Sequence, residues 1–344
     1  MTPSSLRFLQ SRVFTGVSAV LACANAGAGT APLYHLQLLD VPDSTAVQVK
    51  DINDAGVIVG SWSDQDFVRH AAFWDAGGMH ELALPAGVDV DGIAYAINNL
   101  GQVVGTASDF VNPTAGIAWD ITAPTTYTTI GADSGVAVNP ADINDSGAIV
   151  GGFGAPSRAF VWTAADGFVD YGIQDGTVPD QQARWAAVNA SGHIVGRWNQ
   201  HVSNIHATAG DVGVPVVASM SADTETVPTG ANAVNDAGIA VGIGLAVETP
   251  KLVPVLFAAD GTFSEIPGAT LDQDNGGATA INNAGVVVGT AGIGTANDAI
   301  PGLRAWVYRD NVTYNLFNVV DDAGVFVDFS VAVAINASGV IVGT

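Results

Sequence analysis

Cysteine and positive charge are both scarce in this chain of 344 residues. Cys23 is the only cysteine, so a framework of internal disulfides is excluded. Lysine and arginine number 10 against 33 acidic residues, which gives a formal net charge of −23. A surface of this sign repels nucleic acid and anionic membranes, and it suits solubility, divalent cations or cationic partners.

Helical periodicity and long apolar runs are missing as well. The dense glycine (41 residues) and the β-branched runs exclude a solenoid of two-helix repeats. Beyond residue 26, no apolar run is long and unbroken enough to span a membrane. No phosphate loop, zinc-ligand spacing or dinucleotide fingerprint occurs. These absences direct attention to the repeats that fill the chain.

One motif, [AD]-[IV]-N-x-x-G-x-x-V-G, occurs seven times at intervals of 45 to 54 residues, and its first copy is Asp51–Gly60. Each copy is typical of a β-hairpin, because asparagine opens a type I turn and glycine follows in a left-handed position. The second glycine, Gly60 in the first copy, marks a bend or close approach in the outgoing strand. The turn residues are Asn53, Gly56, Asn98, Gly101, Asn144, Gly147, Asn189, Gly192, Asn235, Gly238, Asn282, Gly285, Asn336 and Gly339.

A second pair of strand-like runs follows most hairpins, as in His70–Leu84 and Arg158–Ile173. Four short antiparallel strands in about 45 residues match the size of a β-propeller blade. We therefore predict an all-β propeller of seven four-stranded blades, or six if the last repeat is a true partial blade. The small residues of the hairpin suit the crowded centre, and the aromatic residues of the second pair suit packing between blades.

The N-terminus has the features of a secretory signal peptide over Met1–Ala26, with two arginines, an apolar run and an Ala-x-Ala cleavage site. In this interpretation residues 27–33 are a short linker and residues 34–344 form a single propeller domain. The alternative is a lipobox at Val20–Cys23, which would leave the protein lipid-anchored at Cys23. Secretion into the periplasm or medium is the main expectation for localisation.

The two ends of the repeat region do not match. Tyr34–Leu39 resembles the fourth strand of a unit, whereas Val331–Thr344 supplies only a first hairpin. Joining them would give a closing blade that lacks its third strand. We expect either a chain that is truncated in its last repeat or a natural three-stranded closing blade.

The third strands carry a recurrent run, His70-Ala71-Ala72-Phe73-Trp74 in the first unit and Arg158-Ala159-Phe160-Val161-Trp162 in the third. Together with the I-N-x-x-G-x-V-V-G hairpin, these runs resemble the HAF family of extracellular bacterial repeats over about residues 34–344. The resemblance implies an exported repeat protein, and it transfers no catalytic residue.

A basic residue heads the third strand in several units, namely His70, Arg158, His206 and Arg304. It is either a structural partner of a neighbouring loop or part of a cationic ring that holds an anionic ligand. Asp51–Gly56 resembles part of a calcium loop, but it has too few oxygen ligands, so we predict a hairpin turn and no cofactor, with a calcium site as the alternative. Residues that break the repeat are His201, Arg184, Asp272 and Asp274, and Ala291–Gly302 is an inserted loop.

No recurrent feature builds a catalytic set, so the sequence favours a monomeric binding or scaffolding module with an extracellular ligand, such as a glycan or a protein. The alternatives are a polysaccharide lyase or hydrolase on the same scaffold, or a purely structural envelope protein.

Overall fold

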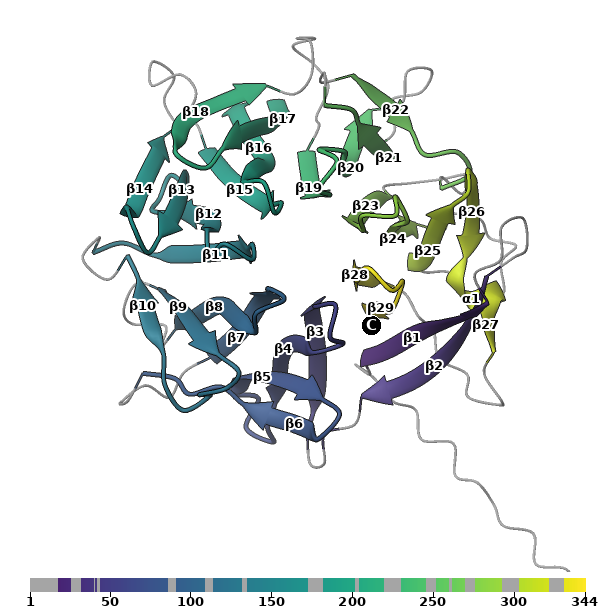
Figure 1. Ribbon diagram of the computed structural model, residues 1–344, viewed down its shortest axis with the longest axis horizontal. Helices are drawn as coiled ribbons and strands as arrows, with labels where there is room; N and C mark the ends of the chain where they lie inside the picture. The colour runs from purple at the N-terminus through teal and green to yellow at the C-terminus, as the bar shows by residue number, and fades with distance from the viewer. Residues whose placement is uncertain are drawn as a thin grey trace, which may run out of the picture.

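A computed structural model describes most of the chain as one closed ring of strands (Figure 1). The described residues are 18–25, 32–39, 41, 44–85, 91–108, 114–131, 135–172, 182–201, 204–219, 230–245, 252–259, 262–269, 276–292, 303–321 and 331–344. They form seven blades around a central axis, and the first strand of each unit lies nearest that axis. The predicted seven-bladed, all-β propeller is therefore confirmed.

Six blades are each built from one continuous stretch of chain, as antiparallel sheets of four strands in sequence order. Blade 1 is β3 (Ala46–Ile52), β4 (Ile58–Ser63), β5 (Arg69–Asp75) and β6 (Gly78–Glu81). Blade 2 is β7 (Asp91–Ile97), β8 (Gln102–Ser108), β9 (Ala115–Asp120) and β10 (Thr128–Ile130). Blade 3 is β11 (Val138–Ile143), β12 (Ile149–Phe153), β13 (Arg158–Thr163) and β14 (Gly167–Gly172).

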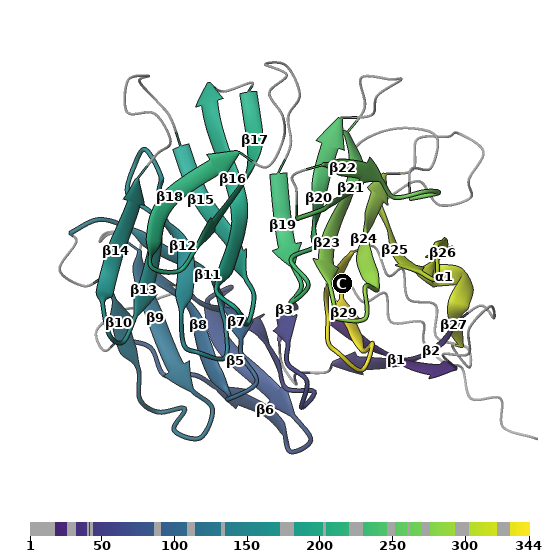
Figure 2. The same cartoon turned by 45° about the horizontal axis from the view of Figure 1, so that its top comes forward.

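The second half of the ring repeats this plan. Blade 4 is β15 (Gln182–Val188), β16 (His193–His201), β17 (Asn204–Asp211) and β18 (Val214–Ser219). Blade 5 is β19 (Gly230–Val234), β20 (Ala240–Leu245), β21 (Leu252–Phe257) and β22 (Phe263–Glu265). Blade 6 is β23 (Gly277–Ile281), β24 (Val287–Gly292), β25 (Leu303–Arg309) and β26 (Val312–Asn315). In Figure 2 the β16–β17 hairpin of blade 4 stands at the upper edge of the ring.

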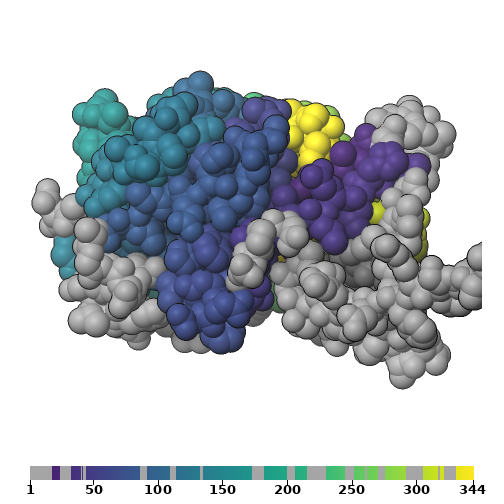
Figure 3. Space-filling view, turned by 90° about the horizontal axis from the view of Figure 1, so that it is seen from below, coloured from purple at the N-terminus to yellow at the C-terminus, as the bar shows by residue number. Residues whose placement is uncertain are grey.

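The closing blade joins both ends of the chain. Its strands lie in the order β28 (Ala332–Ile335), β29 (Ile341–Gly343), β1 (Ser18–Asn25) and β2 (Leu33–Leu39). The two-residue β27 (Val320–Asp321), which follows the helical turn α1 (Leu316–Val319), pairs in parallel with β2. Figure 3 shows the N-terminal strands in purple beside the C-terminal residues in yellow.

This arrangement corrects our expectation that the closing blade lacks a third strand. Ser18–Asn25 takes that place, with Val20 opposite Val342 and Leu21 opposite Ile341. The sequence alone did not identify this strand, because Ala19–Ala24 is an unbroken apolar run without the alternation of apolar and polar residues that marks a half-buried strand. Ala19 and Leu21 are fully buried, and the Ser18 hydroxyl donates to the Val47 carbonyl (2.8 Å).

Each inner hairpin contains a bulge that explains the second glycine of the motif. In blade 1 the pairing shifts between Val49 and Asp51, directly opposite Gly60. A Cβ added to Gly60 would lie 2.0 Å from the Gln48 carbonyl oxygen, so no other residue fits this close backbone approach. The expectation of a close approach at this glycine agrees with the structure.

The core lies between neighbouring blades. Phe73 of blade 1 packs with Trp119 of blade 2 in one cluster, and Phe257 of blade 5 packs with Val195 of blade 4 in another. The aromatic residues of the outer strands thus fill the spaces between sheets, as their pattern predicts. No helix among the described residues is long and apolar enough to cross a membrane.

Candidate functional site

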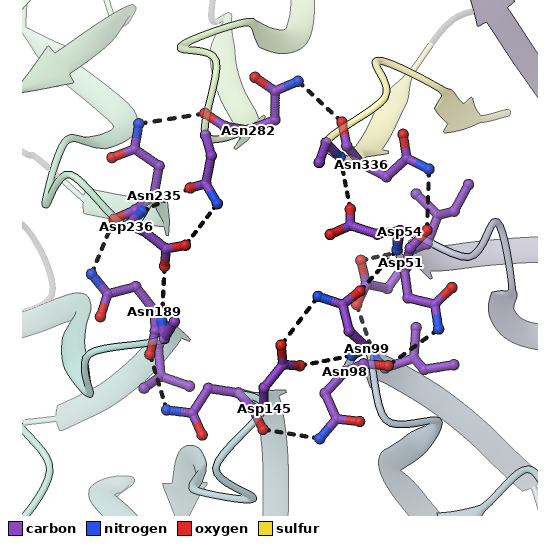
Figure 4. A pocket seen from close by; sticks show the side chains of 18 of the residues that line it. Asp51, Asp54, Asn98, Asn99, Asp145, Asn189, Asn235, Asp236, Asn282 and Asn336 are labelled. Atoms are coloured by element: carbon purple, nitrogen blue, oxygen red, sulfur yellow. Dashed lines mark hydrogen bonds between the residues drawn. The ribbon is translucent and has the colours of Figure 1, made fainter.

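The seven motif asparagines form a closed ring of hydrogen bonds around one end of the channel (Figure 4). Each side-chain Nδ2 donates to the backbone carbonyl of the asparagine in the next blade, at 2.9 to 3.4 Å. Asn336 of the closing blade completes the ring by donating to Asn53 (3.1 Å). All seven asparagines are buried.

The same asparagines also hold their own turns. In blade 1 the Asn53 Oδ1 accepts from the Val57 N–H (2.9 Å), and Gly56 adopts a φ of +81°. Sequence reasoning assigned asparagine to the turn but missed its bond to the next blade. The sequence did carry a signal for this bond, because asparagine occurs in all seven copies of the motif. A turn alone would also accept aspartate or serine at this position.

A second layer of polar residues, directly after the asparagines, forms the rim of this end of the channel. The Asp54 N–H donates to Asn99 Oδ1 (2.9 Å), and the Asn99 N–H donates to Asp145 Oδ1 (2.8 Å). Similar bonds run from Ala337 to Asp54, from Ala190 to Asp236 and from Asp236 to Asn283. Alanine at positions 190 and 337 cannot accept such a bond, so the rim consists of two arcs.

Asp51 and Asp142 occupy a motif position that is alanine in the other five copies. The Asp51 carboxylate accepts from the Ile52 N–H (2.8 Å) and from the Ile97 N–H of blade 2 (2.9 Å). Asp142 repeats this between blades 3 and 4, accepting from Ile143 and Val188. Burial raises the pKa of both carboxyl groups to about 7, while these backbone hydrogen bonds act in the opposite direction. The negative charge of Asp51 raises the pKa of Asp142 further.

Together these residues line an open cup of about 210 Å³ at the mouth of the channel, which we call the asparagine cup. Figure 4 shows the side chains of Asp54, Asp145 and Asp236 directed toward the axis. The lining contains no lysine, arginine or histidine among the described residues. The cup therefore offers carboxylates and amides, which suit cationic or hydroxyl-bearing groups and repel anions.

The basic candidates lie at the opposite end of the blades, on third strands. Each pairs with the residue nine positions after its motif asparagine, so all four share one register. His70 stacks on Trp62 with ring centroids 4.4 Å apart, and its Nε2 lies 3.2 Å from Asp64 Oδ2. Arg158 pairs with Asp170 at 2.5 Å.

The two other members of this set differ in environment. His206 is buried beside Trp198 (ring centroids 5.2 Å apart), and its Nε2 has no hydrogen-bond partner. The backbone of Arg304 lies in β25, and its side chain is outside the described part of the structure. The contacts of His70 and Arg158 are with their own blades, and a ligand-binding role for the set stays a prediction.

The residues that break the repeat do not gather at one site in the described structure. Arg184 lies on β15, opposite Arg197 on β16. The side chain of His201, both residues Asp272 and Asp274, and residues 293–302 of the inserted loop are outside the described residues. The loop turn beginning at Asp51, which we compared with a calcium site, directs its first carboxylate to backbone N–H groups as described above.

Comparison with known proteins supports the architecture. No family model and no curated protein matches the chain. A puromycin-hydrolysing peptidase of Mycobacterium tuberculosis has a TM-score of 0.56 at 10% identity, over 82% of this chain and 47% of that one. A prolyl endopeptidase has a TM-score of 0.51 at 9% identity, over 82% and 44%. A fucose-specific lectin from Aleuria aurantia has a TM-score of 0.44 at 13% identity, over 78% and 94%.

These similarities show the propeller fold and nothing finer, because the identities are low. The chain spans less than half the length of either peptidase. The two peptidases share the propeller fold with this chain, and a fold does not determine a function, so function has to be argued from the residues of the site.

Proposed function

We propose that the chain is a binding module of the HAF-repeat type, exported from a bacterial cell, with the asparagine cup as its ligand-binding surface. The observation that carries the proposal is the cup itself. It is a rigid, solvent-facing site built from all seven blades, and its side chains are polar without being a catalytic set. Pockets with convergent polar groups at the axis of a ring are suited to a small ligand or to the end of a longer one.

The geometry of Asp51 and Asp142 supports binding over catalysis. A general acid or base needs an oxygen that can reach the substrate proton. In both residues each carboxylate oxygen already accepts a backbone N–H, so the pair links blades instead of facing a ligand. Asp54, Asp145 and Asp236 are exposed at the rim and face the cup, although both oxygens of Asp145 and of Asp236 also accept from rim residues. Their second lone pairs are the acceptors open to a ligand.

The expected ligand is a hydroxyl-rich or cationic group, such as the end of a glycan or a basic segment of a protein. Carboxylates and amides accept from hydroxyl and ammonium donors, and charge-assisted bonds of this kind are the stronger ones. An exported location is proposed from the N-terminal segment and the family resemblance, with lipid attachment at Cys23 as the alternative. In the folded chain Cys23 belongs to β1 and pairs with Tyr34, so attachment would require this strand to leave the blade.

The proposal is tested by a screen of glycans and basic peptides against the purified chain, with and without calcium, with product release measured in the same wells. Saturable binding without turnover is the expected result, whereas turnover or the absence of any saturable ligand would contradict it. The variant D54N/D145N/D236N removes three charges and keeps an Oδ1 acceptor for the backbone N–H groups of the rim, as Asn99 and Asn283 do. It loses the side-chain bonds that Asn99 and Asn283 donate to Asp145 and Asp236. We expect it to weaken a cationic ligand at least about tenfold.

A further inference from the structure

Two arginines face each other in blade 4, on adjacent strands. Arg184 of β15 and Arg197 of β16 are direct cross-strand partners. At this register the other described blades have uncharged pairs, which are Gln48–Ser61, Ile93–Thr106, Asn139–Gly152, Gly230–Ile243 and Gly277–Thr290. Blade 4 therefore departs from the repeat at both positions at once.

Neither arginine has an ion pair or a hydrogen bond with a described residue, although the chain contains 33 acidic residues. The other arginines whose side chains are described are all paired, Arg69 with Asp91, Arg158 with Asp170 and Arg309 with Asp310. Like charges directly opposite each other on a sheet are destabilising. Within the described part of the chain, no carboxylate thus compensates this opposed arginine pair.

The pair lies away from the asparagine cup. Arg184 precedes Asn189 by five residues of extended strand, which is a distance of roughly 16 Å along the channel. Both arginines are exposed. A Cβ on Gly152 of blade 3 would lie 3.2 Å from that of Arg184, and one on Gly230 of blade 5 would lie 3.9 Å from that of Arg197. Glycine at these two positions therefore leaves room beside the Cβ atoms of both arginines.

The position of Arg184 in the blade places it beside the channel. Arg184 belongs to β15, the strand of blade 4 that lies nearest the central axis (Figure 1). It is exposed and lies at the end of this strand away from Asn189, and so away from the asparagine cup. Partial desolvation lowers the pKa of its guanidinium, and the positive charge of Arg197 lowers it further, which agrees with two arginines close together.

We propose that Arg184 and Arg197 form an anion-binding site at the channel mouth opposite the asparagine cup, for a carboxylate, sulfate or phosphate group of a small ligand. Two forked guanidinium groups match the oxygens of such an anion and can bind it bidentately. A long polyanion is disfavoured because the net charge of −23 repels it. The site goes beyond the proposed function, since the cup at the other mouth repels anions.

The experiment titrates sulfate, phosphate and acetate against the full chain at constant ionic strength in chloride, followed by calorimetry and by the thermal midpoint. The wild type is expected to bind at least one of these anions saturably, and R184Q/R197Q to lose at least tenfold in affinity. R69Q is the matched control, because it removes an arginine of blade 1 that is paired with Asp91.

A second readout separates this role from a structural one. Without added anion, R184Q/R197Q should unfold at the same or a higher temperature than the wild type, because the like-charge repulsion is gone. The inference is overturned if no anion saturates the wild type, if the double variant binds as well as the wild type, or if R69Q loses as much affinity. D54N/D145N/D236N should bind the anion normally, so failure here and failure of the proposed function at the cup give different results.

Discussion

The closing blade and the six regular blades reach the same architecture by different routes. A regular blade is one continuous stretch of about 45 residues, whereas the closing blade takes β28 and β29 from the C-terminal end and β1 and β2 from the N-terminal end. Its third strand does not have the His-Ala-Phe-like run of blades 1 and 3. The comparison shows that the third strand of a blade needs apolar side chains at the right register. It does not need the repeat sequence.

The register of β1 supports this view. Ala19, Val20 and Leu21 lie opposite Gly343, Val342 and Ile341, as Phe160, Val161 and Trp162 lie opposite Gly151, Val150 and Ile149 in blade 3. The side chains differ in size, but both strands fill the space between two neighbouring blades. Leu21 joins the cluster with blade 6, and Val20 packs against the cluster with blade 1.

The sharpest way to break the comparison is to remove β1. A chain that begins after Ala26, as cleavage at the predicted signal-peptide site would leave it, lacks the strand between β2 and β29. Loss of the buried Leu21 and Val20 side chains and of the pairing on both sides should lower the free energy of unfolding by on the order of 5 kcal/mol. Denaturant unfolding and gel filtration of the truncated chain would measure the loss of stability and any association through the open edges.

The matched control is a chain that begins at Ser18, which keeps β1 and removes only residues outside the described part. It should unfold like the full chain. Equal stability of the two truncated chains would show that β1 contributes nothing and that another segment can close the blade. Cleavage after Ala26 and a closing blade with β1 from the same molecule exclude each other, so this pair of chains also bears on processing.

The regular blades were predictable from the sequence because their signals are local and repeated. The asparagine–glycine turns, the strand glycines and the aromatic third strands each recur at the same place in the unit. The bonds between blades were not predictable, since the partners of Asn53 are separated from it by 45 and 283 residues. Arg184 stood out because it breaks the repeat, but its pairing with Arg197 depends on the register of β15 and β16.

The third strand of the closing blade was mistaken for a leader for a physical reason. An apolar stretch of about ten residues fits a signal peptide and a doubly covered strand equally well. The two interpretations differ in whether the stretch pairs between β29 and β2, and this pairing is visible only in the closed ring. The signal peptide therefore stays a prediction, whereas the described structure contains residues 18–25 as strand β1.

A second test compares two hydrogen bonds of the asparagine ring. One joins two regular blades, and the other joins the closing blade to blade 1. Asn144→Ala removes the bond to the Asn189 carbonyl and leaves the Ala148 N–H without its acceptor. Asn336→Ala does the same to Asn53 and Val340. Each should cost about 3 kcal/mol, because buried polar groups are left unpaired.

The measurement is the free energy of unfolding from urea titration, with Asn99→Ala as a control at the exposed rim, which should cost about 1 kcal/mol or less. Equal losses at positions 144 and 336 would show that the closing junction is energetically the same as a regular one. A much smaller loss at position 336 would mean that the ring is weakest where the two ends of the chain meet.

The smallest expected effect concerns the two junctions that carry aspartate instead of alanine. The pKa of Asp51 and Asp142 is raised from 3.8 to about 7 in the folded chain. An acid with a raised folded-state pKa holds its proton more tightly when folded, so its contribution to stability is greatest below about pH 4 and falls as the pH rises to about 7. Compared with D51A/D142A, the wild type should therefore lose about 2.6 kcal/mol of unfolding free energy per aspartate between pH 5 and pH 8.

The control for this prediction is D54A/D145A, which removes two carboxylates from the same mouth but from exposed positions. It should keep the pH dependence of the wild type, because the buried pair is untouched. Parallel pH profiles for the wild type and D51A/D142A would show that the backbone hydrogen bonds from Ile97 and Val188 outweigh burial. In that case the two aspartates would be ionised links between blades across the whole range, and the aspartate junctions would be the stronger ones at neutral pH.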